Sequence, residues 1–488
     1  MRYPVWNRII LCYVGLSLIV FVLFLIAPVV TFMAKTPLYH IKRYLGLVGG
    51  ALLLVDVFTN RVLWRGPWCV LLYLVCALSA AASVLTIEYG IRTNLFMIAW
   101  TLIQMTLFYS CCYRTDRASM KRYLGRLFAI VMIIWTVACI VSIYQFLFKI
   151  KYVYVIDPRS DDLSTARQGF MEKRLFGIFN PLNHAAYVSV MLFISGLYYL
   201  VRSRKAIPII LLVIGELATA CHVILSGSRS AMVSLLFCSA LFGFAIVKSR
   251  VPGHMAKRIV LAFGSAVICV VLAFGIYTGS KSALSLLPSA ISQSASSGQK
   301  SSKSGKNANK PKEDAEDILE RTDIEDNVSN NRFRIWKDYL SLYDEIGLLG
   351  LSPGNYMSYI RDHNPDLYIV RYIRDNFPEK YEGGVIYHVH NGYLMAFVSS
   401  GILGAALAGV FLILCAIRAL KHLFSRNRIS AEVITCFCVV SAGCINAMFD
   451  SAVFFHDSAP TFIFWIALGA LMKMTAPAAA FEAERGEK

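Results

Sequence analysis

Apolar runs long enough to cross a lipid bilayer dominate this 488-residue chain. A helix of about 18 or more apolar residues spans a hydrocarbon core of roughly 30 Å and satisfies its backbone hydrogen bonds internally. We expect about twelve such helices, at residues 8–33, 44–60, 68–87, 94–113, 124–148, 185–202, 206–225, 231–248, 258–278, 391–420, 431–449 and 452–474. With 57% hydrophobic and 16% charged residues, the composition excludes a soluble globular domain. The sequence therefore predicts an all-α polytopic membrane protein.

Lysine and arginine gather in every second connection between these helices. The basic connections are residues 61–65, 113–126, 202–205, 248–258 and 418–428. Short connections of this kind stay in the cytoplasm, so both termini are predicted to be cytoplasmic. The formal net charge of +18 then reflects topology and attraction to membrane lipids, and nucleic acid is not an expected partner.

One long outward segment divides the chain. Residues 1–278 form a first membrane domain with nine expected helices, and residues 391–474 carry three more before a cytoplasmic tail at 475–488. Between the ninth and tenth helices lies a large extracytoplasmic loop, 279–390. Its first part, 279–320, is of low complexity and rich in Ser and Lys, including an insertion at 296–312. The remainder, 321–390, is predicted to be a partly helical cap.

The cap sequence NRFRIWKDYLSLYDEIGLLG (331–350) predicts an amphipathic helix. Ile335, Tyr339 and Tyr343 recur at helical spacing, with Trp336 and Leu340 beside them. The 13 cysteines of the chain lie in or at the ends of expected helices. None lies in the two long segments expected to face outward, 149–184 and 279–390. The sequence thus offers no disulfide framework, and we expect neither a metal site nor another cofactor.

Two arginines stand out on the predicted outward face. Arg229 lies in LSGSRSAMVSL, in a connection of only a few residues. An arginine at membrane depth costs roughly 2.5–3.5 kcal/mol and usually marks a pathway or a ligand, although it can also snorkel to headgroup phosphates. The small residues around Arg229 would let a phosphate approach its guanidinium. Arg332 lies four residues before Trp336 on the expected cap helix.

A histidine opens the apolar stretch HNGYLMAFVSSGILG, residues 390–404. Imidazole titrates near pH 6.5, so His390 can accept a proton from a hydroxyl at neutral pH. The alternative is structural: Asn391 caps the helix, and His390 only hydrogen-bonds to a neighbour. His184 and His388 belong to the same predicted face. Two arginines and a histidine suit transfer from a lipid diphosphate, because guanidinium groups stabilise the departing diphosphate while the histidine deprotonates an alcohol.

Residues 390–404 resemble the signature of the O-antigen ligase family, His-(Asn/Ser/Gln)-x9-Gly-x-x-(Gly/Thr/Tyr). His390, Asn391, Gly401 and Gly404 occupy its fixed positions. Other pieces that resemble the family follow in the same order, namely RLFGIFNPLNHAA (174–186), SGSRSA, RFRIW, PGNY and HVHNGYL. The resemblance extends from residue 174 onward, and the first five helices match only as hydrophobic segments.

The resemblance implies a GT-C-like fold in the bacterial cytoplasmic membrane with an outward-facing active site. Such an enzyme transfers a glycan from undecaprenyl diphosphate to a glycan or lipid-glycan acceptor, without a metal ion, in cell-surface polysaccharide biosynthesis. It implies that Arg229 and Arg332 bind the diphosphate and that His390 acts as base or aligns the reactants. Arg334 is the alternative to Arg332 for the diphosphate contact on the cap. The implied supporting contacts are Asn180, Asn183 and Asn391.

Two alternatives remain. The superfamily also contains repeat-unit polymerases, although the polymerase pattern Arg-x10-Gly is absent at Arg159, Arg167, Arg332 and Arg334. A transporter or flippase of lipid-linked oligosaccharides would carry charged residues near the middle of its helices. Here such residues are few, Asp56 and Glu216 being the clearest. The sequence therefore favours a transferase and leaves the acceptor open.

Overall fold

The computed structural model describes residues 3–59, 64, 66–155, 165–252, 254–291, 331–426 and 429–477. Within these ranges nine helices are long and apolar enough to cross a membrane. They are α1 (Tyr3–Leu23), the continuous run of α5, η4 and α6 (Arg92–Arg114), α7 (Arg117–Leu147), α8 (Leu182–Arg202), α9 (Ala206–Ser226), α10 (Arg229–Arg250), α11 (Met255–Ser285), α18 (Gly392–Ser425) and α19 (Ala431–Phe449). The prediction of a multi-pass membrane protein is confirmed.

Three further helices coincide with predicted apolar runs. Two of them, α4 (Cys69–Leu85) and α20 (Ala459–Met474), are apolar but shorter. The third, α3 (Ile41–Thr59), carries Lys42, Arg43 and Asp56. Each of the twelve predicted runs thus contains a helix, while the number of membrane crossings stays a prediction.

Two of the predicted helices are interrupted or shortened. The first run, 8–33, breaks after Leu23, and a short helix α2 (Ala27–Ala34) begins with Pro28 in its first turn. The last run, 452–474, becomes helical only at Ala459, where the Ser458 side chain caps the backbone and Pro460 starts the helix. Residues 450–458 are irregular and mostly buried.

The all-α prediction is wrong for the outward segment before α8. Residues 151–155 and 165–177 form a three-stranded antiparallel sheet of β1 (Lys151–Val155), β2 (Thr165–Met171) and β3 (Arg174–Gly177). The run KYVYV in β1 consists largely of β-branched and aromatic residues, which favour strands. Next to the sheet, the Ile178 N–H donates to the Ser142 hydroxyl of α7 over 3.1 Å. The sheet and this hydrogen bond therefore fix the position of the chain just before α8.

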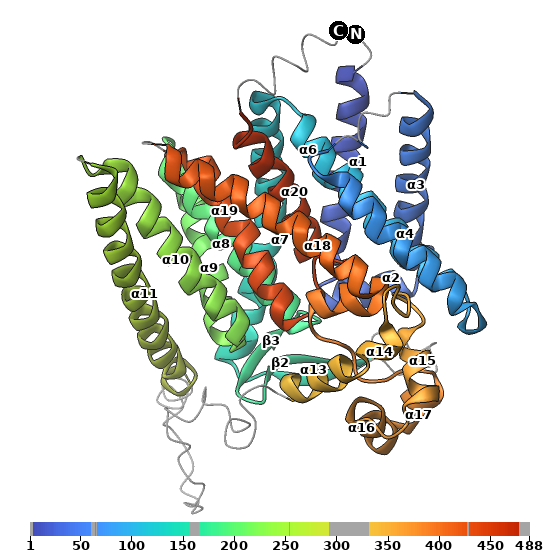
Figure 1. Cartoon of the computed structure of the whole chain (residues 1–488). Helices are drawn as coiled ribbons and strands as arrows, with labels where there is room; N and C mark the ends of the chain where they lie inside the picture. The colour runs from blue at the N-terminus through green and yellow to red at the C-terminus, as the bar shows by residue number, and fades with distance from the viewer. Residues whose placement is uncertain are drawn as a thin grey trace, which may run out of the picture.

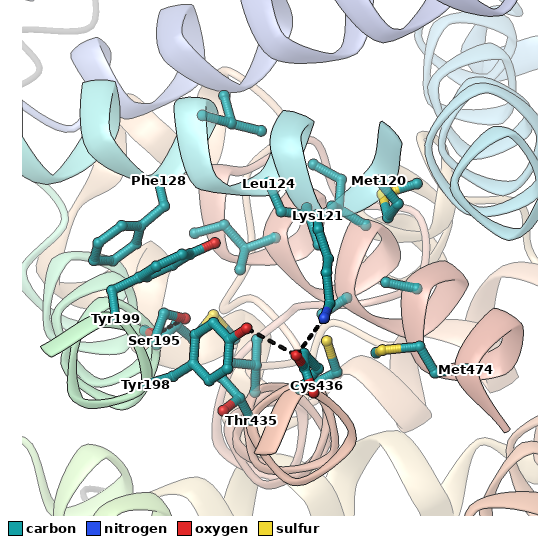
Figure 2. Close-up of a pocket in the computed structure, with 18 of the residues that line it drawn as sticks. Met120, Lys121, Leu124, Phe128, Ser195, Tyr198, Tyr199, Thr435, Cys436 and Met474 are labelled. Atoms are coloured by element: carbon teal, nitrogen blue, oxygen red, sulfur yellow. Dashed lines mark hydrogen bonds and ion pairs between the residues drawn. The ribbon is translucent and has the colours of Figure 1, made fainter. Parts of the chain in front are cut away.

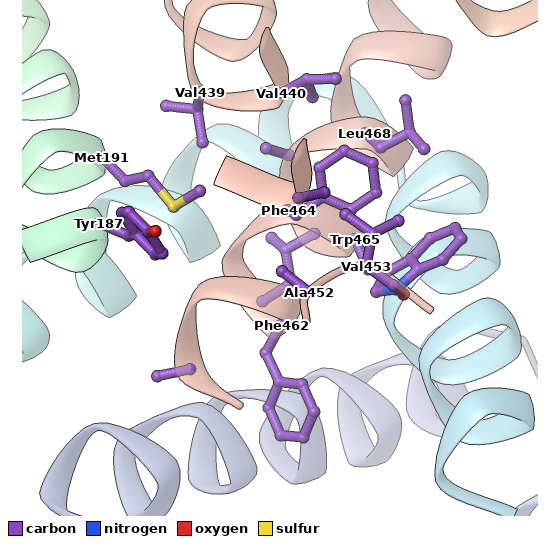
Figure 3. Close-up of a cluster of buried hydrophobic side chains, with 14 of the residues drawn as sticks. Tyr187, Met191, Val439, Val440, Ala452, Val453, Phe462, Phe464, Trp465 and Leu468 are labelled. Carbon is purple, nitrogen blue, oxygen red and sulfur yellow. The ribbon is translucent and has the colours of Figure 1, made fainter. Parts of the chain in front are cut away.

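Figure 3 shows a cluster of buried hydrophobic side chains that includes residues of α8, α19 and α20. Phe462 and Trp465 of α20 and Tyr187 of α8 are fully buried. The Trp465 indole N–H donates to the Val453 carbonyl over 3.0 Å. This bond anchors the irregular segment 450–458 to the core, so side chains on that segment are held in fixed positions.

The cap lies at one end of the helix bundle, opposite the end that holds the start of α1 and the end of α20 (Figure 1). Its helices are α13 (Arg332–Ser341), α14 (Tyr343–Ile346), α15 (Tyr356–His363), α16 (Tyr368–Asn376) and α17 (Pro378–Glu382). Ile335 and Tyr339 of α13 are buried, whereas Tyr343 and Leu340 are exposed. The Tyr339 hydroxyl donates to the Tyr387 carbonyl over 2.7 Å, which positions the chain just before His390.

The PGNY turn fixes the cap to the connection between α4 and α5. The Asn355 side-chain amide donates to the carbonyls of Thr86 and Gly90 over 2.8 and 2.7 Å, and the Gly354 N–H donates to the Asn94 side-chain oxygen over 2.6 Å. The cap is thus tied to a distant part of the membrane domain. Residues 292–330, which include most of the predicted low-complexity part 279–320 and the whole insertion 296–312, lie outside the described residues, as does 478–488 of the tail.

At Gly401, a fixed position of the family signature, α18 is interrupted, and the backbone of the cap packs against the break. Its φ of 69° and ψ of −170° belong to a region that essentially only glycine adopts. At the break, the Ile402 N–H donates to the Gly347 carbonyl over 3.0 Å, and the Leu351 N–H donates to the Val398 carbonyl over 2.8 Å. Residues 347–351 therefore satisfy backbone groups that the interrupted helix leaves open.

Replacing Gly401 with alanine is expected to destabilise the protein by about 3 kcal/mol or more. A β-carbon at this position would overlap the Leu348 carbonyl and would also strain the backbone. Gly409, on the same helix, is a matched control because a β-carbon there meets no atom within 4 Å. Thermal unfolding in detergent should show a lower midpoint for Gly401→Ala and none of this loss for Gly409→Ala. Equal midpoints of the two variants would contradict the close packing of residues 347–351 against the break at Gly401.

Candidate active site

His390 faces a buried carboxylate at the end of the bundle that carries the cap. It occupies the short connection between α17 and α18, with a left-handed φ of 46°. Its Nδ1 lies 3.5 Å from Oδ1 of Asp450, the residue that follows α19. The imidazole is 36% exposed and the Asp450 side chain 13%. Catalytic hydrogen bonds are often this long before a substrate binds, so the pair can orient His390 while its ring stays accessible.

Other histidines surround the same carboxylate. His184 Nε2 lies 3.6 Å from Asp450 Oδ2, and its ring centroid is 5.2 Å from that of His456. His388 Nδ1 is 2.9 Å from the Ser451 hydroxyl oxygen and also accepts the His390 backbone N–H. The His184 side chain is only 9% exposed, so a reactant reaches His390 far more easily than His184.

The charge state of this cluster follows from its burial. Burial opposes ionisation of Asp450, but the nearby imidazoles of His390 and His184 outweigh it and hold the pKa of Asp450 well below its ordinary value. Burial lowers the pKa of His388 to about 4 and that of His456 to about 3. Near pH 7 the cluster therefore contains one carboxylate and neutral imidazoles at His388 and His456.

The structure separates the two rival cap arginines. Arg332 is half-buried at the start of α13, and its charge acts on Tyr387, whose ring centroid is 5.8 Å from that of His390. Arg334 is exposed, and its guanidinium stacks over the Tyr368 ring at 3.9 Å. Arg332 thus belongs to the surroundings of His390, while Arg334 is held on the cap surface.

Arg229 is the first residue of α10, immediately after the tight turn that joins it to α9. Gly227 in this turn has a φ of 60°, and the backbone carbonyl of Ser226 accepts a hydrogen bond from Arg174 Nε over 2.8 Å. Arg174 Nη2 also donates to the Asn183 side-chain oxygen over 3.3 Å. Arg174 therefore ties the turn that positions Arg229 to the start of α8.

Tyr187 connects the Arg229 region to the histidine cluster. Its hydroxyl lies 2.9 Å from that of Ser230, the residue after Arg229. The charges of Asp450, Arg332 and Arg174 also act on this hydroxyl. Tyr187 therefore lies between the start of α10 and the charged groups of Asp450, Arg332 and Arg174.

The candidate asparagines have structural contacts. Asn391 caps α18, since its side-chain oxygen accepts from the N–H groups of Tyr393 and Leu394 over 2.9 and 3.1 Å. Its amide donates to the Met448 carbonyl over 3.2 Å, near the end of α19. Asn180 lies in the turn before α8, where its backbone N–H donates to the Leu25 carbonyl over 2.9 Å. Asn391 therefore keeps His390 beside Asp450.

The sequence interpretation missed Asp450, Arg174 and His456. A signal for Asp450 was present, because the connection after the expected helix 431–449 faces outward on the predicted topology. Arg174 stands at the head of RLFGIFNPLNHAA. Among the described residues, no three His, Cys, Asp or Glu side chains are arranged to hold a metal ion.

Comparison with known families matches residues 214–409 to the model of one family, described as O-antigen ligase. The matched range runs from within α9 to within α18, and it contains Arg229, Arg332, His390 and Gly401. The resemblance stated from the signature is thereby confirmed, although the match covers less than half of the chain and ends before Asp450. A search of curated proteins found no match.

Proposed function

We propose that this chain transfers a glycan from undecaprenyl diphosphate to an acceptor hydroxyl, because residues 214–409 match the model of the O-antigen ligase family, which suggests a ligase- or polymerase-type membrane glycosyltransferase. The reaction would take place on the outer face of the bacterial cytoplasmic membrane. The observation that carries the proposal is the accessible imidazole of His390 held against the buried carboxylate of Asp450, with Arg332 nearby.

In the proposed reaction His390 is the general base. Asp450 holds Nδ1 of the imidazole, which leaves Nε2 to take the proton of the acceptor hydroxyl. The acceptor oxygen then bonds to the anomeric carbon, while the bond from that carbon to the diphosphate oxygen breaks. The electron pair leaves with the diphosphate, whose charge Arg229 and Arg332 stabilise.

The family match suits a ligase and a polymerase equally, so the acceptor distinguishes them. A ligase would pass the glycan to a lipid-glycan such as a lipid A core, and a polymerase would pass it to the end of another lipid-linked repeat unit. The absence of Arg-x10-Gly at the arginines tested in the sequence supports the ligase.

Purified protein in detergent with EDTA, mixed with a fluorescent undecaprenyl-diphosphate oligosaccharide, tests the proposal. Release of undecaprenyl diphosphate only when an acceptor is added is expected, and the product then identifies ligase or polymerase. Release that EDTA prevents would contradict the metal-independent reaction. No release with any acceptor, together with movement of the intact lipid across reconstituted bilayers, would instead identify a transporter.

A further inference from the structure

An apolar cavity lies in the membrane domain far from His390. It has a volume of about 160 Å³ and is lined by α1, α7, α8, α19 and α20. Leu124, Met191, Ile463 and Ala467 are among its wall residues. It lies toward the end of the bundle that holds the start of α7 and the end of α20, opposite the cap (Figure 1). Protein interiors are normally close-packed, so a cavity of this size and character has room for an apolar ligand.

One side of the cavity is bounded by a stacked aromatic pair. The rings of Phe128 on α7 and Tyr199 on α8 lie 4.6 Å apart and nearly parallel. Figure 2 shows this pair beside the apolar side chains of α7. The lining is thus hydrocarbon and aromatic over most of its area, which suits an acyl chain better than a polar metabolite.

The rim of the same cavity is charged. Glu432 pairs with Lys121 at 2.5 Å and with Arg202 at 2.9 Å, and it accepts a hydrogen bond from the Tyr198 hydroxyl over 3.1 Å. In Figure 2 Lys121 and Tyr198 point toward this one carboxylate. The single acidic residue of the rim is therefore already neutralised.

Further basic residues leave the rim positively charged. Arg117 lines the cavity, and its Nη2 donates to the Met474 carbonyl over 3.1 Å, which is an uncharged acceptor. Lys473 also lines the cavity. An apolar interior with a basic rim at one membrane surface matches an amphiphile whose headgroup is an anion.

We propose that this cavity binds an anionic phospholipid of the cytoplasmic leaflet, with one acyl chain between α7, α8, α19 and α20 and the phosphate against Arg117 and Lys121. On the predicted topology this end of the bundle faces the cytoplasm, where basic pockets between helices bind anionic lipid headgroups. The lipid would fill space between helices that the protein leaves open. The proposal does not depend on the transferase reaction.

Thermal unfolding of the delipidated full-length protein in detergent tests the proposal. Added dioleoyl phosphatidylglycerol should raise the unfolding midpoint, and dioleoyl phosphatidylcholine, with the same acyl chains but no net charge, should raise it much less. Arg117→Gln should at least halve the shift. Lys257→Gln, an exposed residue at the start of α11 outside the cavity, should leave the shift unchanged. Equal shifts with both lipids would overturn the headgroup assignment.

A cavity-filling variant tests the acyl-chain part independently. Ala467→Leu should raise the midpoint of the lipid-free protein, because it fills apolar space, and should reduce the shift that phosphatidylglycerol produces. Native mass spectrometry should likewise show less retained phosphatidylglycerol on this variant than on wild type. Undiminished retention and an undiminished shift in Ala467→Leu would overturn the proposed site, whatever the stability of the Arg117 variant.

Discussion

Replacing His390 with alanine is expected to lower the rate of undecaprenyl diphosphate release by about 10²–10⁴-fold, the usual contribution of a general base. The acceptor hydroxyl then has no group to take its proton, while the diphosphate contacts remain. Release from the fluorescent donor, measured with a saturating acceptor, gives the rate directly. Donor binding should change little, so the loss should fall on kcat rather than on KM.

Two further variants distinguish loss of the base from misfolding. His390→Asn should be equally inactive, and asparagine tolerates the left-handed backbone at this position better than alanine. His363→Ala removes an exposed cap histidine that contacts the Tyr359 ring and carbonyl, so it should retain wild-type activity. Wild-type rates in both His390 variants would show that the histidine is structural.

Asp450 provides a second test of the same pair. Because the pKa of Asp450 is held below its ordinary value, its pairing with His390 is fully present above the ordinary value and is lost only as the pH falls through the lowered one. The pairing is therefore present in wild type across pH 6–8, and Asp450→Asn should reduce activity over this range. The loss should be smaller than in His390→Ala, because the base itself remains. The double variant should be about as impaired as His390→Ala alone. Additive losses would show that Asp450 does not act through His390.

Replacing Arg229 with alanine is expected to lower the release rate by about 10²–10³-fold, comparable to loss of one donor that stabilises a developing negative charge. The guanidinium fork can hold two diphosphate oxygens, so Arg229→Lys should recover only part of the activity. The same release assay measures both variants. A smaller loss with a lysine than with an alanine would indicate that charge and geometry both contribute.

The control for Arg229 lies on the same helix. Arg250, at the other end of α10, is exposed and distant from the cap, and Arg250→Ala should retain wild-type release. Equal activity of Arg229→Ala and Arg250→Ala would place Arg229 among snorkelling arginines and would remove it from the site.

The helices could be predicted because apolar length alone determines them. The sheet of β1, β2 and β3 and the irregular segment 450–458 were missed because both lie beside apolar runs, and a run of hydrophobic residues does not show where its backbone stops being helical. Pro460 and Ser458 were the local signals for the later start of α20. Helix boundaries, rather than helices, were the weak part of the prediction.

The candidate site was predictable as a set of stretches but not as a geometry. Topology placed the stretches around Arg229, Arg332 and His390 on one face. Which of Arg332 and Arg334 turns inward depends on how α13 packs, since neighbours two residues apart point to different sides of a helix. His390 and Asp450 are 60 positions apart in the chain. The sequence around either residue does not predict that the two are paired.

The break at Gly401 also has a consequence for biogenesis. The backbone groups of Gly347 and Leu351 in the cap find their partners in Ile402 and Val398, which the ribosome makes about fifty residues later. On the predicted topology the cap is therefore translocated before its anchor exists, and its docking completes only when α18 has entered the bilayer. Insertion of that single helix would then be the event that assembles the outward face, because it brings His390 and the cap into place together.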